Sequence, residues 1–330
     1  MNNNVKISVC VPVYGVEKYI ERCARSLFEQ TLADGVEFIF VNDCTKDNSI
    51  EVLRNVLADY PARQPQTHIV EHEQNKGLSA SRNTAVAAAI GKYIYHTDPD
   101  DFIEKNALQE LLQTAESQNA NMVINELIWY WNDQHKIVFP KKFSDRKDFL
   151  YKILTRKLQC GVVGNLIERE LYTANNITTP ALNMGEDYVT TPRLAYYAEN
   201  IVLHPQPMYY YYKNNENAMS RTPSLKKLQD MIDGHNYLVD FFQDKLAENE
   251  FTAWVKDMRI ENFVIMFEYS VTNIEHLKYL RKNFSCNSWL IGTRYSLKIK
   301  IANILFQLGW LRGIIWGTDI LKFLRSMKKR

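Results

Sequence analysis

Short apolar runs alternate with segments of helical periodicity in the N-terminal part of the chain. The apolar runs predict strands at Ile7–Val13, Val36–Val41, Ile69–Glu71 and Tyr93–Thr97. The segments between them place apolar residues three and four positions apart, and they predict helices at Glu17–Gln30, Asp47–Tyr60 and Leu78–Ile90. Strands that are apolar throughout and alternate with helices are typical of a parallel sheet covered on both faces.

Farther along the chain the pattern is mixed and then becomes helical. It predicts strands at Met122–Trp131, Val162–Ile167, Ile201–Leu203 and Met208–Tyr212. It predicts helices at Lys105–Ser117, Ser144–Leu154 and Gly185–Tyr197, and helical spacing continues from Leu225 to the end. The predicted fold class is α/β: a Rossmann-like, mostly parallel sheet flanked by helices, with a helical C-terminal extension.

The fourth predicted strand runs directly into three carboxylates, Asp98, Asp100 and Asp101. Burying them without partners would be costly, so they must be solvated, hydrogen-bonded or bound to a cation. Carboxylates at a strand end suit a hard divalent cation that also holds the phosphates of a substrate. An acidic turn that caps the next helix, Lys105–Ser117, explains the run equally well. The run alone leaves both interpretations open.

Polar loops also follow the earlier strands, and ligands of parallel sheets bind outside the carboxyl ends of the strands. Asp43 could accept hydrogen bonds from a nucleotide base, Gly77 could let the backbone approach a ligand, and Arg82 could bind phosphate. Singly, each is explained as well by a cap, a turn or a surface arginine. Together they are typical of a nucleotide pocket. Neither GxGxxG nor GxxxxGK[ST] occurs, which argues against dinucleotide-binding and P-loop proteins.

Taken with these loops, a set of ordered motifs resembles the family 2 glycosyltransferases, which are inverting enzymes with the GT-A fold. The motifs are Val9-Cys10-Val11-Pro12-Val13-Tyr14, Glu17-Lys18-Tyr19-Ile20, Phe40–Ser49, Asn75–Asn83, Asp98-Pro99-Asp100-Asp101 and Gly185-Glu186-Asp187-Tyr188. Their order and spacing fit the family from residue 5 to residue 222. As a set they are specific, whereas the Asp-x-Asp motif alone would be weak.

The resemblance implies a site for a nucleotide-sugar donor and a divalent metal. The implied donor contacts are Pro12, Val13, Tyr14, Glu17, Asp43, Gly77, Arg82, Asp98 and Arg221. Asp98 and Asp100 would form the Asp-x-Asp motif that binds Mn²⁺ or Mg²⁺, which neutralises charge on the leaving nucleotide. Asp187 would be the general base that deprotonates an acceptor hydroxyl, with Glu186 as its rival for that role.

The expected function is metal-dependent, inverting transfer of a sugar from a nucleotide sugar, first of all a UDP-sugar. The expected acceptor is a hydroxyl of a glycan or of a lipid-linked molecule in cell-surface polysaccharide synthesis. The segment Asn42-Asp43-Cys44-Thr45 departs from the frequent Asp-Asp-Gly-Ser of the family, which bears on the choice of donor base.

Two alternatives remain open at this point. One is a nucleotidyltransferase of related fold, although Pro12-Val13-Tyr14-Gly15 carries none of the glycine and basic residues of a triphosphate loop. The other is a non-catalytic relative that binds sugar or membrane, against which the intact carboxylates argue.

Charge is distributed unevenly along the chain. The overall net charge of +2 gives no case for nucleic-acid binding. Residues 289–330, however, carry nine basic residues against Asp319 alone, a net charge of +8. Five cysteines without paired spacing and an N-terminus without a signal-peptide pattern favour a reducing cytoplasm.

The expected organisation has three parts: a GT-A catalytic domain at 1–222, a helical extension at 223–288 and a basic amphipathic tail at 289–330. The tail combines helical spacing of Ile and Leu with tryptophans and lysines. This pattern fits an interfacial helix on the anionic inner face of the cell membrane. A helix packed on the body with solvated lysines is the alternative.

Overall fold

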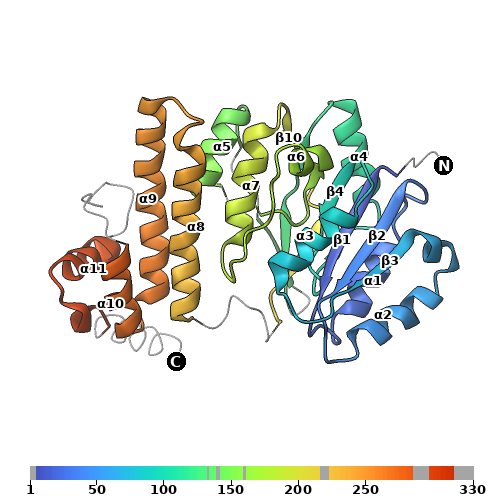
Figure 1. The fold of residues 1–330 in the computed structure, drawn as a ribbon, viewed down its shortest axis with the longest axis horizontal. Helices are drawn as coiled ribbons and strands as arrows, with labels where there is room; N and C mark the ends of the chain where they lie inside the picture. The colour runs from blue at the N-terminus through green and yellow to red at the C-terminus, as the bar shows by residue number, and fades with distance from the viewer. Residues whose placement is uncertain are drawn as a thin grey trace. The chain divides into compact units, whose positions relative to one another are not determined.

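The computed structural model describes residues 5–131, 134–138, 142–158, 161–215, 223–284 and 297–315. The chain divides into two compact units (Figure 1). The first comprises Met1–Ile153 with Lys157–Ala218, and the second comprises Leu154–Arg156 with Met219–Arg330.

A seven-stranded sheet forms the centre of the first unit. Its strand order is β10-β6-β9-β4-β1-β2-β3. The strands are β1 (Ile7–Val13), β2 (Val36–Asn42), β3 (Thr67–Glu71), β4 (Tyr93–His96), β6 (Met122–Ile124), β9 (Leu166–Glu168) and β10 (Ile201–Leu203). β1 pairs in parallel with β2 and β4, and β9 is antiparallel to both β4 and β6. The other six strands therefore end at one edge.

Apolar side chains bury the strands between helices. The helices of this unit are α1 (Ile20–Phe28), α2 (Ser49–Ala58), α3 (Leu78–Ala88), α4 (Ala107–Ser117), α5 (Arg146–Leu154), α6 (Arg169–Thr173) and α7 (Glu186–Tyr197), with a 3₁₀ helix at Pro61–Gln66. Every residue of β1 is buried, as expected for a central strand of a covered sheet. Val9, Ile20 and Leu111 share one core cluster that joins β1, α1 and α4.

The predicted strand at Met122–Trp131 is wrong as a single element. The chain forms β6 and then a separate strand, β7 (Leu127–Trp131), in a second sheet. Asn125 interrupts the run because its backbone N–H donates to the Asn165 side chain at 2.8 Å instead of to a neighbouring strand.

The predicted strand at Val162–Ile167 also differs, because regular pairing begins only at Leu166. Before it, Gly164 adopts φ +73° with the ring of Tyr209 packed against its Cα, and Val163 forms an isolated bridge with His96.

The second sheet has the order β5-β11-β7-β8. Its strands are β5 (Phe102–Ile103), β7, β8 (Gln134–Val138) and β11 (Tyr209–Tyr212). β5 follows the acidic run directly, and β11 is antiparallel to it. This pairing brings the tyrosines of β11 beside the carboxylates that end β4.

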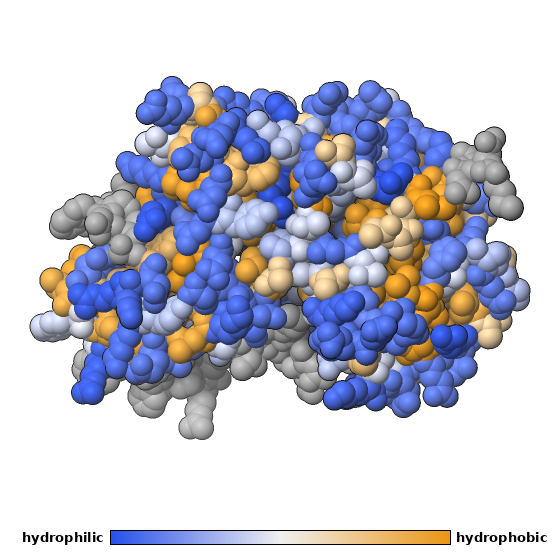
Figure 2. Space-filling view, viewed as in Figure 1, coloured by the Kyte–Doolittle hydropathy of each residue, from blue (hydrophilic) through white to orange (hydrophobic). Residues whose placement is uncertain are grey.

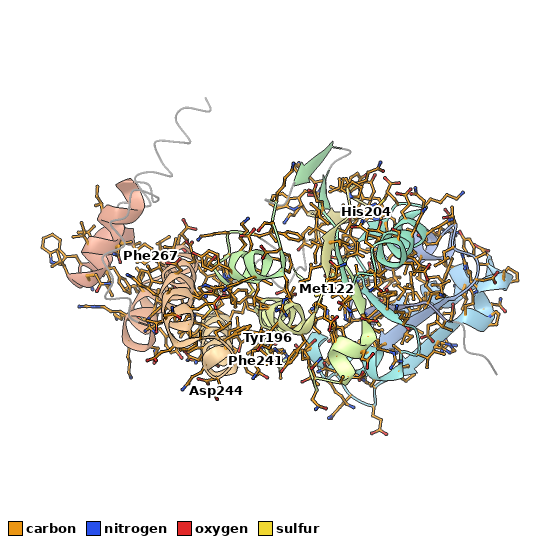
Figure 3. The ribbon with its side chains drawn as sticks, turned by 90° about the horizontal axis from the view of Figure 1, so that it is seen from above. Met122, Tyr196, His204, Phe241, Asp244 and Phe267 are labelled. Atoms are coloured by element: carbon orange, nitrogen blue, oxygen red, sulfur yellow. The ribbon has the colours of Figure 1, made fainter. Side chains whose placement is uncertain are left out.

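The second unit is helical in its described residues, as predicted. It contains α8 (Leu225–Gln243), α9 (Glu248–Ser270), α10 (Ile274–Asn283) and α11 (Leu297–Gln307). Phe267 of α9, labelled in Figure 3, packs edge-on against Phe306 of α11. None of the helices in the described part of the chain is long and apolar enough to cross a membrane.

Candidate active site

The loops that follow β1 and β2 are joined by side-chain hydrogen bonds. The backbone N–H of Gly15 donates to Thr45 at 2.9 Å, and that of Glu17 donates to Asp47 at 3.0 Å. In return the Glu17 carboxylate accepts from the backbone N–H of Asn48 at 3.1 Å. Glu17, one of the expected donor contacts, therefore orders the rim of the site.

The other predicted residues at the end of β1 differ in exposure. Pro12 and Val13 are buried in register with β2, whereas Tyr14 is 50 % exposed at the edge of the sheet. Tyr14 is therefore the residue of the three that a ligand above the strand ends can reach.

Asp43 organises the loop that precedes α3. Its buried carboxylate accepts hydrogen bonds from the backbone N–H groups of Lys76 and Gly77, both at 2.8 Å. His72 lies 2.7 Å away through Nδ1. Both oxygens of Asp43 are thus engaged by the protein, and its base-binding role stays a prediction.

Arg82 joins two motifs that are far apart in sequence. Its buried guanidinium donates to Asp98 at 3.0 Å and to Glu186 at 2.7 Å. Burial alone lowers the pKa of Arg82, but the two carboxylates hold it above its usual value. The arginine therefore stays charged and ties the acidic run after β4 to the start of α7.

A neighbouring asparagine fixes the segment before α7. Asn83 donates to the carbonyl of Thr179 at 2.9 Å and accepts from its backbone N–H at 2.7 Å. Because Arg82 and Asn83 are consecutive on α3, that helix positions both the approach to α7 and its first residue.

The predicted base and its rival lie in different surroundings. Glu186 has a side chain only 12 % exposed, and its pKa is raised to about 7 by burial and by Asp187, against the opposing charge of Arg82. Asp187 accepts from the backbone N–H of Tyr188 at 2.7 Å. A Cβ at Gly161 would lie 2.7 Å from an Asp187 oxygen, so a glycine makes room for this carboxylate.

Asp101 is a fully buried structural carboxylate. It accepts from the hydroxyl of Tyr209 at 2.6 Å and from the backbone N–H of Tyr212 at 2.7 Å. The Tyr209 hydroxyl also accepts from the backbone N–H of Asp98 at 3.0 Å. Tyr209 therefore fixes the turn that presents Asp98 and Asp100.

Asp100 remains close to the edge of the sheet. One of its oxygens accepts from Asn215 at 2.7 Å, and its backbone carbonyl accepts from Arg22 at 2.7 Å. Burial and then the charge of Asp98 raise its pKa. Arg82 offsets the charge of Asp98, whereas Asp100 forms no ion pair of its own among the described residues, so negative charge at this pair of carboxylates is only partly balanced.

This donor set fits a cation that takes most of its ligands from a substrate. Among the described residues there is no group of three His, Cys, Asp or Glu side chains arranged to hold a metal by itself. Mg²⁺ in nucleotide sites is commonly held by one or two carboxylates and otherwise by phosphates and water. Asp98 and Asp100 supply two carboxylates and excess negative charge. Arg221, the remaining predicted contact, lies outside the described residues.

Comparison with known proteins decides the family. Residues 8–167 match the model of glycosyl transferase family 2. The uncharacterized glycosyltransferase EpsJ of Bacillus subtilis is 30 % identical over 226 residues, which cover 66 % of this chain and 63 % of EpsJ. The chain belongs to glycosyl transferase family 2.

Solved structures share the fold of this family 2 chain. The crystal structure of S. aureus TarS 1-349 in complex with UDP-GlcNAc has a TM-score of 0.70 at 18 % identity, covering 94 % of this chain and 88 % of that one. The mannosyltransferase PcManGT from Pyrobaculum calidifontis, in complex with GDP-Man and Mn²⁺, has a TM-score of 0.54 at 15 % identity, covering 96 % of this chain and 86 % of that one. The predicted GT-A fold is confirmed. The chain spans somewhat less than two thirds of EpsJ.

Several residues of the site were not found from the sequence of this glycosyltransferase family member. They are His72, Tyr209 and Asn215, which bind Asp43, Asp101 and Asp100. His72 directly follows β3 at the ligand-binding edge, which was a usable signal. Neither Tyr209, which lies in the second sheet, nor Asn215, which follows β11, could be matched to its partner from the sequence, because each lies more than a hundred positions from it.

Proposed function

We propose that the protein is a glycosyltransferase that moves a sugar from a nucleotide sugar to an acceptor hydroxyl. The observation that carries this proposal is the Arg82 bridge between Asp98 and Glu186. It holds the carboxylates expected to bind the donor next to the Glu186–Asp187 pair, as a transfer reaction requires. We also propose that the chain consists of a catalytic domain at 1–222, a helical extension at 223–288 and a basic tail at 289–330.

A UDP-sugar is the proposed donor. TarS, which shares the fold, was crystallised with UDP-GlcNAc and with UDP. In this chain Tyr14 offers an exposed aromatic ring at the end of β1, and the loops after β1 and β2 form one hydrogen-bonded rim beside it. A ring and a polar rim suit a nucleoside, with the diphosphate then directed toward Asp98 and Asp100.

The proposed reaction inverts the anomeric carbon. The acceptor oxygen forms a bond to that carbon while the bond to the diphosphate oxygen breaks, and the nucleoside diphosphate leaves with the electron pair. The hydroxyl proton passes to Asp187, because a sugar hydroxyl is a poor nucleophile until a carboxylate accepts its proton. Glu186 holds Arg82 and thereby the geometry of Asp98.

Asp98 and Asp100 are the proposed ligands of Mn²⁺ or Mg²⁺. When bound there, the cation would neutralise negative charge on the departing diphosphate. Burial and then the charge of Asp98 raise the pKa of Asp100, and the same ion would balance the charge of both carboxylates. Asp101 has no part in this because both of its oxygens are bonded to the second sheet.

The test is nucleoside diphosphate release from UDP-GlcNAc, UDP-Glc, UDP-Gal and GDP-Man with Mn²⁺, and again after EDTA. We expect Asp100→Ala and Asp187→Ala to lower turnover by about 100-fold or more. Glu116→Gln, a surface carboxylate on α4 paired with Lys6, is the matched control and should behave as wild type. Proton NMR of the product reports its anomeric configuration. Unimpaired turnover in both aspartate variants contradicts the assigned roles.

We also propose that the region around α11 binds an anionic membrane surface. Ile301 and Ile304 on α11 and Leu308 and Trp310 just after it are 43–68 % exposed, and the first three follow one another at helical spacing. Figure 2 shows apolar surface over the part of the second unit where α11 lies. Residues 289–330 carry a net charge of +8, which complements anionic lipid headgroups. A membrane-bound enzyme would meet a lipid-linked acceptor in two dimensions.

Flotation with phosphatidylglycerol vesicles tests this surface. Leu308→Asp with Trp310→Asp should abolish flotation of the full chain, because both exposed side chains would have to carry charge into the interface. Tyr237→Ser, which removes a similarly exposed aromatic ring from α8, is the control and should float as wild type. Equal flotation of the Asp variant and the wild type would refute the proposal.

A further inference from the structure

Two buried polar side chains that follow β6 each have one polar atom without a hydrogen-bond partner. Asn125 and Glu126 interrupt the chain between β6 and β7, and they are 6 % and 7 % exposed. Among the described residues, the side-chain Nδ2 of Asn125 and Oε2 of Glu126 have no hydrogen-bond partner. Met122, labelled in Figure 3, marks the start of this strand within the first unit.

Such burial is costly in the absence of a ligand. A buried carboxylate without partners loses hydration and gains no hydrogen bond in return. Burial alone raises the pKa of Glu126 to about 7, and no basic side chain offsets this. Asn125 uses only its carbonyl oxygen, which accepts from the backbone N–H of Met208 at 3.3 Å. One acceptor and one amide donor thus remain available.

The location of this pair relates it to the catalytic carboxylates. β6 and β4 run in the same direction with β9 between them, so Glu126 follows a strand end on the same edge as Asp98. Two strand spacings separate the two positions by about 10 Å along the edge.

A chain of contacts spans that gap. The Asn125 backbone N–H donates to the Asn165 side chain at 2.8 Å, and Asn165 donates to the Gly161 carbonyl at 2.7 Å. Gly161 in turn lies against the Asp187 carboxylate. The unpartnered groups therefore lie on the side of Asp187 away from the Asp43 loop, which leaves the donor side of the sheet edge free for a nucleotide.

We propose that Glu126, assisted by Asn125, is a positioning residue that binds the hydroxyl groups of a sugar acceptor beside Asp187. This inference rests on the proposed function. A carboxylate accepts hydrogen bonds from two hydroxyls, and an amide N–H donates to a third oxygen, which matches the donors and acceptors of a sugar ring. A bound sugar satisfies the groups that the fold leaves unpaired, and it orients the attacking hydroxyl toward Asp187.

The experiment separates donor hydrolysis from transfer to an acceptor. Release of nucleoside diphosphate is measured with the most active donor of the panel above, in buffer alone and with p-nitrophenyl glycosides of glucose, galactose and N-acetylglucosamine. Glu126→Gln should leave hydrolysis within twofold of wild type. It should raise the acceptor KM by about 10- to 100-fold, the range for a hydrogen bond to a charged group.

Glu168→Gln is the matched control, because Glu168 is a half-buried carboxylate at the opposite end of β9, bonded to Asn121. It should leave the acceptor KM unchanged. Thermal unfolding of each variant shows whether the fold is retained. A wild type that releases no nucleotide from any donor refutes the proposed function itself.

Three results overturn the role of Glu126 while the proposed function stands. One is equal loss of hydrolysis and transfer in Glu126→Gln. Another is an unchanged acceptor KM in that variant. The third is wild-type hydrolysis that none of the glycosides accelerates.

Discussion

The buried guanidinium of Arg82 stays charged because two carboxylates of the candidate site pair with it. Its two carboxylate partners come from the turn after β4, at 3.0 Å, and from the first residue of α7, at 2.7 Å. Removing one partner of such a buried pair leaves an uncompensated charge, which is strongly destabilising. We infer that replacing Arg82 or Glu186 alone destabilises the fold, whichever carboxylate accepts the proton.

The pKa of Glu186 gives a testable pH dependence. Burial and Asp187 raise it from 4.5 to about 7, so the carboxylate is protonated below that pH and its pairing with Arg82 weakens. We expect kcat/KM for donor turnover to rise as pH increases through about 7 and then to level off. The measurement is the pH–rate profile from pH 5 to 9 for wild type and Glu186→Gln.

The raised pKa of Glu186 affects stability in the opposite direction from activity. Between pH 4.5 and about 7 the folded protein binds a proton that the unfolded chain has released, so this group lowers the free energy of unfolding as pH rises. Glu186→Gln should lose both effects. An inflection near pH 7 that survives in the variant would assign the titration to another group.

Tyr209 should be the hydroxyl whose removal disturbs the acidic turn most. Tyr209→Phe leaves the buried Asp101 with one fewer donor and the Asp98 backbone N–H without its acceptor. We expect a loss of about 1–3 kcal/mol in the free energy of unfolding, measured by urea denaturation.

Tyr210→Phe is the control for this prediction. Tyr210 donates to Glu104 from a half-buried position, where water replaces the lost bond, so the cost should stay below about 1 kcal/mol. Similar losses in the two variants would show that Tyr209 has no special role in the turn.

At the level of elements, α3 contributes more to the site than its length suggests. Its N-terminal loop is held by Asp43, and Arg82 and Asn83 reach the segments around α7. The start of α3 depends on Gly77, which adopts φ +87° and ψ 166°. A residue with a Cβ is strained at these φ and ψ angles, even though no atom lies within 4 Å of where the Cβ would be.

Gly77→Ala should therefore lower the free energy of unfolding by about 1–3 kcal/mol through backbone strain alone. It should also raise the donor KM, because the Gly77 N–H would no longer align with Asp43. Thermal unfolding and donor kinetics measure the two effects. Gly313→Ala, at a glycine with similar open space and no left-handed φ, should cost nothing. A variant as stable as wild type would contradict the assigned strain.

For the whole molecule, the separation of charge is the property that composition alone conceals. A net charge of +2 is the sum of a basic segment at 289–330 and an acidic remainder. The exposed apolar residues of α11 lie within that basic segment. Electrostatic attraction to a surface depends on salt, whereas burial of apolar side chains does not weaken in the same way.

Binding to phosphatidylglycerol vesicles should therefore weaken as salt rises from about 0.05 M to about 0.5 M, where screening is nearly complete within a few ångströms. Co-sedimentation at a series of salt concentrations measures this. Phosphatidylcholine vesicles are the control and should bind weakly at all of them. Salt-independent binding to the anionic vesicles would show that charge does not contribute.

The sequence by itself determined the parallel core, the family resemblance and most of the candidate site. The prediction for Ile7–Val13 agrees with β1 in both bounds, and those for the next three strands agree to within two residues. These features are local: apolar runs, helical spacing and short motifs record the preferences of neighbouring residues. Motifs such as the one containing Asp98 and Asp100 are likewise short and contiguous.

Only the tertiary structure decided how these motifs meet and what else surrounds them. The antiparallel insertion of β9, the second sheet and the Tyr209–Asp101 bond join residues far apart in the chain. So does the bridge from Arg82 to Glu186, over 104 positions. One oxygen of Glu126 has no hydrogen-bond partner because none of the elements packed around it places a donor there. Such contacts arise from packing of the whole chain, and no local pattern encodes them.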